Sequence, residues 1–163
     1  MPSTLNTLSV IGAGAMGRGI AQMAAQAGSL VLLYDTQSPA VAQAIQGIGE
    51  QWDKLVAKGR MDAAAAADCK RRLRPAATLA ELKDCEVVIE AIVERLDVKR
   101  SLFAELEGIV GPDAILASNT SSLSVTAIAA GLNRPERVAG FHFFNPVPLM
   151  KVCLLYTSDA ADE

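Results

Sequence analysis

The chain has 163 residues, of which 51% are hydrophobic and 20% charged, and its formal net charge is −3. This length suits one domain with a sizeable buried core, so a disordered tail and a disulfide-stapled miniprotein are excluded. The balance of 15 Lys and Arg against 18 Asp and Glu supplies no positive field for a phosphate backbone, so no nucleic-acid partner is expected.

Short apolar runs alternate with helix-forming stretches along the chain. Strands are predicted over residues 8–11, 30–34, 86–93, 114–117 and 137–143. Helices are predicted over residues 15–27, 40–58, 61–74, 97–110 and 124–131. Unbroken apolar runs such as 30–34 are typical of parallel strands that are covered on both faces. The alternation predicts an α/β fold of the Rossmann type, with a doubly wound, mostly parallel sheet and helices on both faces.

A glycine-rich motif, Gly12-Ala13-Gly14-Ala15-Met16-Gly17, connects the first predicted strand to the first helix. Asp35 ends the next strand, 23 residues after Gly12, which is the spacing of the dinucleotide-binding fingerprint. The glycines would allow a tight turn and close approach of a pyrophosphate to the helix N-terminus. Asp35 would accept hydrogen bonds from the ribose hydroxyls and repel a 2′-phosphate, which favours NAD over NADP. The alternative is that the glycines only make a tight turn.

Several polar residues follow predicted strands, where open α/β sheets bind ligands. His142, the only histidine, lies near the end of the last strand, and its imidazole could take a proton from an alcohol during hydride transfer. The polar run 118–122 follows the preceding strand, although Ser122 could instead cap the next helix. Glu94 and Lys99 follow the strand before that. The alternatives are a structural histidine and a solvated loop with a charge pair at a helix start.

Together these residues resemble the NAD-binding domain of the L-3-hydroxyacyl-CoA dehydrogenase family, which includes 3-hydroxybutyryl-CoA dehydrogenases. The resemblance covers residues 7–152 and rests on segments 11–17, 89–94 with Lys99, 118–123 and 142–148. It implies a Rossmann domain and an oxidoreductase of fatty-acid metabolism, including β-oxidation. The family oxidises the 3-hydroxyl of a (3S)-3-hydroxyacyl-CoA to the 3-ketoacyl-CoA and passes a hydride to NAD.

The resemblance also implies roles for individual residues. His142 would be the general base, Ser121 would hydrogen-bond the 3-hydroxyl of the substrate, and Lys58 would contact the phosphates of CoA. The residues that would contact NAD are Gly12, Gly14, Ala15, Met16, Gly17, Asp35, Val93, Glu94, Lys99, Asn119 and Asn145. No metal ion is implied.

The chain departs from the family pattern at its C-terminal end. The family has a glutamate 12 residues after the histidine, which orients the imidazole, and this chain has Leu154 at that position. The family also has a further helical domain that closes the cleft and makes a homodimer, and we expect this domain to be absent from the 163 residues. We therefore expect an NAD-binding domain over residues 1–152 and a non-family tail over 153–163, read through from a sequencing adapter. The fragment is expected to be poorly active.

Two other functions fit the same motifs: a related hydroxyacid or sugar-acid dehydrogenase, and an NAD-binding module without catalysis. The three cysteines, Cys69, Cys85 and Cys153, are odd in number and lack C-x-x-C spacing. This pattern indicates neither a disulfide framework nor a zinc site, so a reducing compartment such as the cytoplasm is expected. No apolar run of about 18 uncharged residues is present, so no membrane span is expected.

Overall fold

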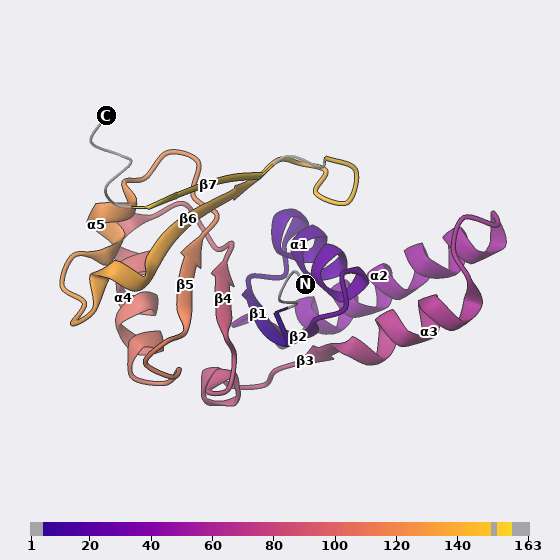
Figure 1. Ribbon diagram of the computed structural model, residues 1–163, viewed down its shortest axis with the longest axis horizontal. Coiled ribbons are helices and arrows are strands. Elements are labelled where there is room, and N and C mark those ends of the chain that lie inside the picture. The colour runs from indigo at the N-terminus through magenta and orange to yellow at the C-terminus, as the bar shows by residue number, and fades with distance from the viewer. Residues whose placement is uncertain (1–4, 151–152, 158–163) are drawn as a thin grey trace.

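The computed structural model describes residues 5–150 and 153–157. The strands are β1 (Thr7–Ile11), β2 (Leu30–Tyr34), β3 (Leu73–Pro75), β4 (Val87–Glu90), β5 (Ile115–Ser118), β6 (Val138–Phe143) and β7 (Cys153–Thr157). They form one sheet in the order β3-β2-β1-β4-β5-β6-β7. Strands β1 to β6 are parallel, and β7 is antiparallel to β6. The predicted Rossmann-type fold is confirmed (Figure 1).

Helices cover both faces of this sheet. The α-helices are α1 (Ala15–Gln26), α2 (Ser38–Ala57), α3 (Ala63–Arg72), α4 (Leu96–Glu107) and α5 (Val125–Ala129), with short 3-10 helices η1 (Leu79–Leu82) and η2 (Pro135–Arg137). Helices α1, α2 and α3 form one layer, and α4 and α5 form the other (Figure 1). Helices α2 and α3 make a hairpin that extends beyond the edge of the sheet (Figure 1). Of the described helices, none is long and apolar enough to cross a membrane.

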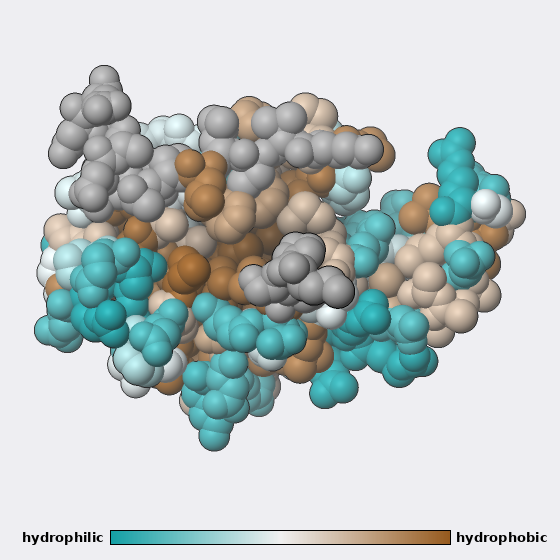
Figure 2. Space-filling model, viewed as in Figure 1, coloured by the Kyte–Doolittle hydropathy of each residue, from teal (hydrophilic) through white to brown (hydrophobic). Residues whose placement is uncertain are grey.

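The two helical layers create two apolar cores. In β2, Val31 and Leu33 pack in the core under α1 to α3, whereas Leu32 and Tyr34 pack against the core under α4 and α5. Because both faces of the central strands are covered, these strands are apolar without interruption. In the face shown in Figure 2, apolar residues gather in the middle of the molecule, and hydrophilic residues lie at its lower rim and at the tip of the α2–α3 hairpin.

Some predicted boundaries were wrong, and some short elements were missed. The helix predicted to reach residue 74 ends at Arg72, and residues 73–75 form β3 beside β2. Three residues are too few to show a strand period, and Pro75 is tolerated because β3 is an edge strand. The strand predicted to reach residue 93 ends at Glu90, opposite the last paired residues of β1 and β5. The short helices η1 and η2 were not predicted.

Strand β7 was also not predicted, since residues 153–163 were expected to be a tail without family counterpart. The backbone of residues 153–157 pairs with β6, and Leu154 lies directly opposite His142 in this ladder. Residues 158–163 of the expected tail lie outside the described residues. The domain boundary at residue 152 stays a prediction.

Candidate active site

The glycine-rich loop after β1 has two glycines that packing requires and one that leaves open space. Gly12 has φ of +109°, and a Cβ there would lie 2.4 Å from the Ala91 carbonyl oxygen. A Cβ at Gly17 would lie 1.7 Å from the Gly12 carbonyl oxygen. A Cβ at Gly14 would meet nothing within 4 Å, and no described side chain caps the N-terminus of α1. The loop therefore leaves room for a phosphate beside the first N–H groups of the helix.

Asp35, at the end of β2, holds this loop in place. Its Oδ2 accepts a hydrogen bond of 2.8 Å from the Ala13 N–H, and its Oδ1 accepts one of 2.8 Å from the Gln37 N–H. The half-buried carboxylate also lines a cavity of about 560 Å³, which we call the cofactor cavity. Gly12 and Gly14 line the same cavity, and Val93, Leu79, Val98 and Leu102 give it an apolar wall. An apolar slot beside a carboxylate and an open helix N-terminus fits the adenosine and pyrophosphate of NAD.

A second cavity, of about 340 Å³, contains His142 and is called the His142 cleft. It brings together predicted site residues from separate parts of the chain: Met16, Glu94, Lys99, Asn119, Ser121, His142 and Asn145. Ala91 and Ile92 line both the His142 cleft and the cofactor cavity, so the two cavities adjoin. The arrangement places an imidazole and a serine hydroxyl next to the cofactor cavity.

His142 lies near the end of β6, and its ring centroid is 5.0 Å from that of Phe144. Among the described side chains, none hydrogen-bonds the imidazole. The next residue, in contrast, has a hydrogen-bond partner: the Phe143 N–H donates to Asn119 Oδ1 over 2.9 Å. This hydrogen bond connects β6 to the end of β5. Position 154, where the family resemblance implies an orienting carboxylate, faces His142 across the ladder and carries leucine.

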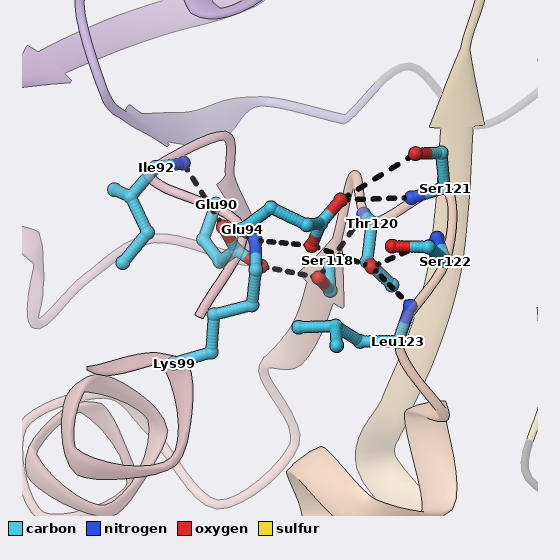
Figure 3. Close-up of polar contacts among 9 residues, drawn as sticks. All are labelled: Glu90, Ile92, Glu94, Lys99, Ser118, Thr120, Ser121, Ser122 and Leu123. Atoms are coloured by element: carbon cyan, nitrogen blue, oxygen red, sulfur yellow. Dashed lines mark hydrogen bonds and ion pairs between the residues drawn. The ribbon is translucent and has the colours of Figure 1, made fainter. Parts of the chain in front are cut away.

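The wall of the His142 cleft contains a buried ion pair (Figure 3). Lys99 is 1% exposed, and its Nζ lies 2.8 and 2.7 Å from the two carboxylate oxygens of Glu90, which is 0% exposed. Glu90 also accepts hydrogen bonds from the Ser118 hydroxyl and from the Ile92 N–H. A buried charge is costly unless it is paired and hydrogen-bonded, and here the pair and its donors meet that requirement.

Glu90 was not selected as a site residue from the sequence. The sequence contains one signal for it, an acidic residue in an otherwise apolar run. A carboxylate in a strand that is covered on both faces needs a buried cationic partner. Lys99 follows nine residues later, at the first turns of α4. The third member, Ser118, comes from β5, and only the register that sets Glu90 opposite Ser118 brings it close.

Glu94 connects this ion pair to the serine loop (Figure 3). Its carboxylate lies 3.5 Å from Lys99 Nζ and accepts hydrogen bonds from the Thr120 hydroxyl at 2.7 Å and the Ser121 N–H at 3.2 Å. The Ser121 hydroxyl lies 3.5 Å from the same carboxylate. Partial burial acts to raise the pKa of Glu94, but the hydrogen bonds from Thr120 and Ser121 and the charge of Lys99 outweigh it and leave this pKa below its ordinary value. Glu94 is therefore ionised at neutral pH.

Three predicted site residues line neither cavity: Lys58, Ala15 and Gly17, of which Gly17 packs against the Gly12 carbonyl as described above. Lys58 is the C-cap residue of α2, at the exposed turn of the α2–α3 hairpin. Ala15, the first residue of α1, lines a third cavity between α1 and α2. The α2–α3 hairpin places Lys58 away from the residues that surround His142.

Residues 7–163 match the family model described as "3-hydroxyacyl-CoA dehydrogenase, NAD binding domain". The chain belongs to this family. It is an NAD-binding Rossmann domain of an oxidoreductase family, and NAD is its cofactor. The match includes residues 153–163, the predicted non-family tail. When bound, NAD supplies the acceptor for a hydride, and the glycine loop, Asp35 and the cofactor cavity are the parts of this chain that fit it.

Curated relatives and solved structures agree with this assignment. The chain is 46% identical over 152 residues to 3-hydroxyadipyl-CoA dehydrogenase of Escherichia coli strain K12, covering 93% of the chain and 32% of that protein. It is 41% identical over 163 residues to 3-hydroxybutyryl-CoA dehydrogenase of Bradyrhizobium diazoefficiens, covering 100% of the chain and 56% of that protein. The crystal structure of 3-hydroxybutyryl-CoA dehydrogenase from Escherichia coli K12 superposes with a TM-score of 0.92 at 45% identity, covering 94% of the chain and 32% of that structure. The chain thus spans about a third to just over half of the length of these relatives.

Proposed function

We propose that the protein carrying this chain oxidises the 3-hydroxyl of a (3S)-3-hydroxyacyl-CoA to a ketone, with NAD as the hydride acceptor. The single observation that carries the proposal is the His142 cleft, where an imidazole, Ser121 and Asn145 adjoin the cofactor cavity. The substrate class is supported by the relatives, whose names are those of dehydrogenases of 3-hydroxyacyl-CoA compounds.

In this reaction the residues of the chain hold the alcohol and remove its proton. His142 takes the hydroxyl proton as the hydride leaves the same carbon, so the imidazole ends the step protonated. The Ser121 hydroxyl, which lies 3.5 Å from the Glu94 carboxylate, donates its proton to a lone pair of the 3-oxygen. The single proton of the substrate hydroxyl is then left for His142. Positioning of the alcohol against the cofactor supplies much of the rate acceleration.

Leu154 bears on how active the chain itself is. A leucine opposite His142 can neither accept the imidazole N–H nor stabilise the imidazolium that forms. In serine proteases, loss of the orienting carboxylate lowers turnover by about 10⁴. We propose that the chain by itself is a poor catalyst for this reason, and the same observation favours, as the second candidate function, an NAD-binding module without catalysis.

The test is the reverse reaction, reduction of acetoacetyl-CoA by NADH, followed by the loss of NADH absorbance with the full chain in excess. Wild type should react slowly, and Leu154→Glu should react at least about tenfold faster. Leu154→Gln is the matched control, since it adds a polar group of the same shape without the charge. Equal rates for wild type and His142→Gln would overturn the role of His142. No reaction in Leu154→Glu at saturating ligands would favour the module without catalysis.

The cellular setting is part of the same proposal. Cys69 and Cys85 are buried, and among the described residues both are free thiols. Reduced thiols support a reducing compartment such as the cytoplasm. The homodimer that the family resemblance implies belongs to the proposal for the whole protein.

A further inference from the structure

Strand β6 extends past the end of its neighbour β5, and His142 lies in the part that extends. The β5–β6 pairing ends with Ser118 opposite Gly140, so no described strand pairs with residues 141–143 on the β5 side. On the other side, β7 pairs with β6 as far as Phe143. Phe143 is 5% exposed, and a buried N–H without an acceptor is unfavourable. This part of β6 therefore needs an acceptor that the backbone of β5 does not supply.

The side chain of Asn119 supplies this acceptor. Asn119 directly follows β5, and its backbone N–H donates to the Glu90 carbonyl oxygen of β4 over 2.9 Å. The backbone of Asn119 is thus anchored to β4, whereas its carboxamide reaches β6, where Oδ1 accepts the Phe143 N–H over 2.9 Å. The half-buried Asn119 lines the His142 cleft. One carboxamide thus takes the place of a strand partner at the edge of the cleft.

This hydrogen bond acts on the backbone that carries the imidazole. A peptide unit is planar, so the Phe143 N–H and the Cα and carbonyl of His142 lie in one plane. An acceptor that holds this N–H therefore restricts rotation about the Cα–C bond of His142. Among the described side chains, none hydrogen-bonds the imidazole. Its direction therefore depends on this backbone and on the ring of Phe144, whose centroid is 5.0 Å away.

We infer that Asn119 is a positioning residue for His142 and that it acts through the Phe143 N–H. The inference rests on the proposed function, in which His142 takes the proton of the substrate hydroxyl. It adds the means by which the chain directs a base that faces leucine at position 154. This role differs from the contact with NAD that the family resemblance implies for Asn119, because the carboxamide oxygen is engaged by β6. Positioning matters because a displacement of about 1 Å can slow a reaction about 10²-fold.

The first experiment follows the full chain by NMR without ligands. His142 is the only histidine, so its ring C–H resonances report a single imidazole. Asn119→Leu keeps the size of the side chain and removes the acceptor. It should speed amide hydrogen exchange of Phe143 about fivefold, as expected for the loss of one hydrogen bond. It should also shift the His142 ring resonances, because the imidazole moves relative to the Phe144 ring.

Two further variants separate positioning from a general effect on the fold. Asn119→Asp keeps an oxygen acceptor and should retain the wild-type exchange rate of Phe143. Asn133→Leu is the matched control, since Asn133 is exposed, donates to Glu107 at 3.3 Å and lines none of the three cavities. It should leave the exchange of Phe143 and the His142 resonances unchanged.

The second experiment separates positioning of the base from a contact with the cofactor. In single turnovers of acetoacetyl-CoA reduction with the full chain in excess, Asn119→Leu should lower the rate about tenfold at saturating NADH. The Kd for NADH should stay at the wild-type value. A contact between Asn119 and NAD would instead raise this Kd and leave the exchange of Phe143 unchanged.

Unchanged Phe143 exchange and unchanged His142 resonances in Asn119→Leu would overturn the inference and leave the proposed function standing. A raised Kd for NADH with both NMR signals unchanged would overturn it as well. If both signals change but neither wild type nor Leu154→Glu reduces acetoacetyl-CoA, the proposed function fails, and the role of Asn119 in the reaction fails with it. Should Asn119→Leu not fold, Asn119→Ala decides by the same two signals.

Discussion

The two sides of the His142 cleft differ in how fully their polar groups are paired. On the β4–β5 side, Glu90, Lys99 and Ser118 are buried and joined to one another by hydrogen bonds. On the β6 side, the His142 imidazole has no hydrogen-bond partner among the described side chains, and position 154 across the ladder is leucine. The first side is organised by this chain alone before any ligand binds. The second side lacks such pairing among the described residues, so substitutions on the two sides should act differently on stability and on the proposed catalysis.

The largest effect is expected on the paired side, from Lys99→Met. Removal of the amine leaves the Glu90 carboxylate buried without a countercharge, which should lower the free energy of unfolding by about 3–5 kcal/mol. Urea denaturation measures this change. The double variant Glu90→Leu with Lys99→Met should recover much of the loss, because apolar groups in place of both charges leave no uncompensated one. If the free energy of unfolding of Lys99→Met lies within about 0.5 kcal/mol of that of wild type, the ion pair does not stabilise the β4–β5 side of the cleft.

The glycine loop offers a sharper separation of stability from binding. Gly17→Ala puts a methyl group 1.7 Å from the Gly12 carbonyl oxygen, so it should destabilise the fold by about 1–3 kcal/mol. Gly14→Ala meets nothing within 4 Å and should change stability by less than about 0.5 kcal/mol. Its methyl group occupies the space left for the pyrophosphate, so it should weaken NADH binding. If Gly14→Ala binds NADH as wild type does, the phosphate does not lie at this loop.

The smallest effect concerns pH and the link between the two sides. Because the pKa of Glu94 is lowered in the folded chain, its contribution to stability is present above its unfolded pKa of about 4.3 and is lost as pH falls through the folded pKa. Glu94→Gln should remove this part of the acid dependence. The carboxylate is 39% exposed, so the difference from wild type should stay below about 1 kcal/mol. Unfolding free energies from pH 7 to about pH 3 measure it, and parallel curves for the two chains would contradict the assignment.

Much of the fold could be predicted because its signals are local. Neighbouring residues alone identify the apolar runs of β1, β2 and β5 and the glycine-rich turn after β1. The sheet and this turn could therefore be predicted from the sequence. The three residues of β3 carry no such signal, since their strand state depends on pairing with β2. The same holds for β7, whose pairing with β6 brings distant residues together.

The candidate site also combines residues with a local sequence signal and contacts that depend on how separate elements pack. Asp35 was predicted from its spacing to the glycines, but its hydrogen bond to the Ala13 N–H depends on how the loop folds back on β2. Ser118 reaches Glu90 only through the β4–β5 register. Contacts between elements are what the sequence pattern could not supply.

The measurement that tests the central claim most directly is a fluorescence titration of the full chain with NADH, with NADPH as the comparison. The cofactor cavity and the carboxylate of Asp35 predict saturable binding of NADH and much weaker binding of NADPH, because the 2′-phosphate would meet that carboxylate. Asp35→Asn should narrow the difference between the two cofactors. Equal binding of NADH and NADPH by the wild-type chain, or binding of neither, would contradict the account.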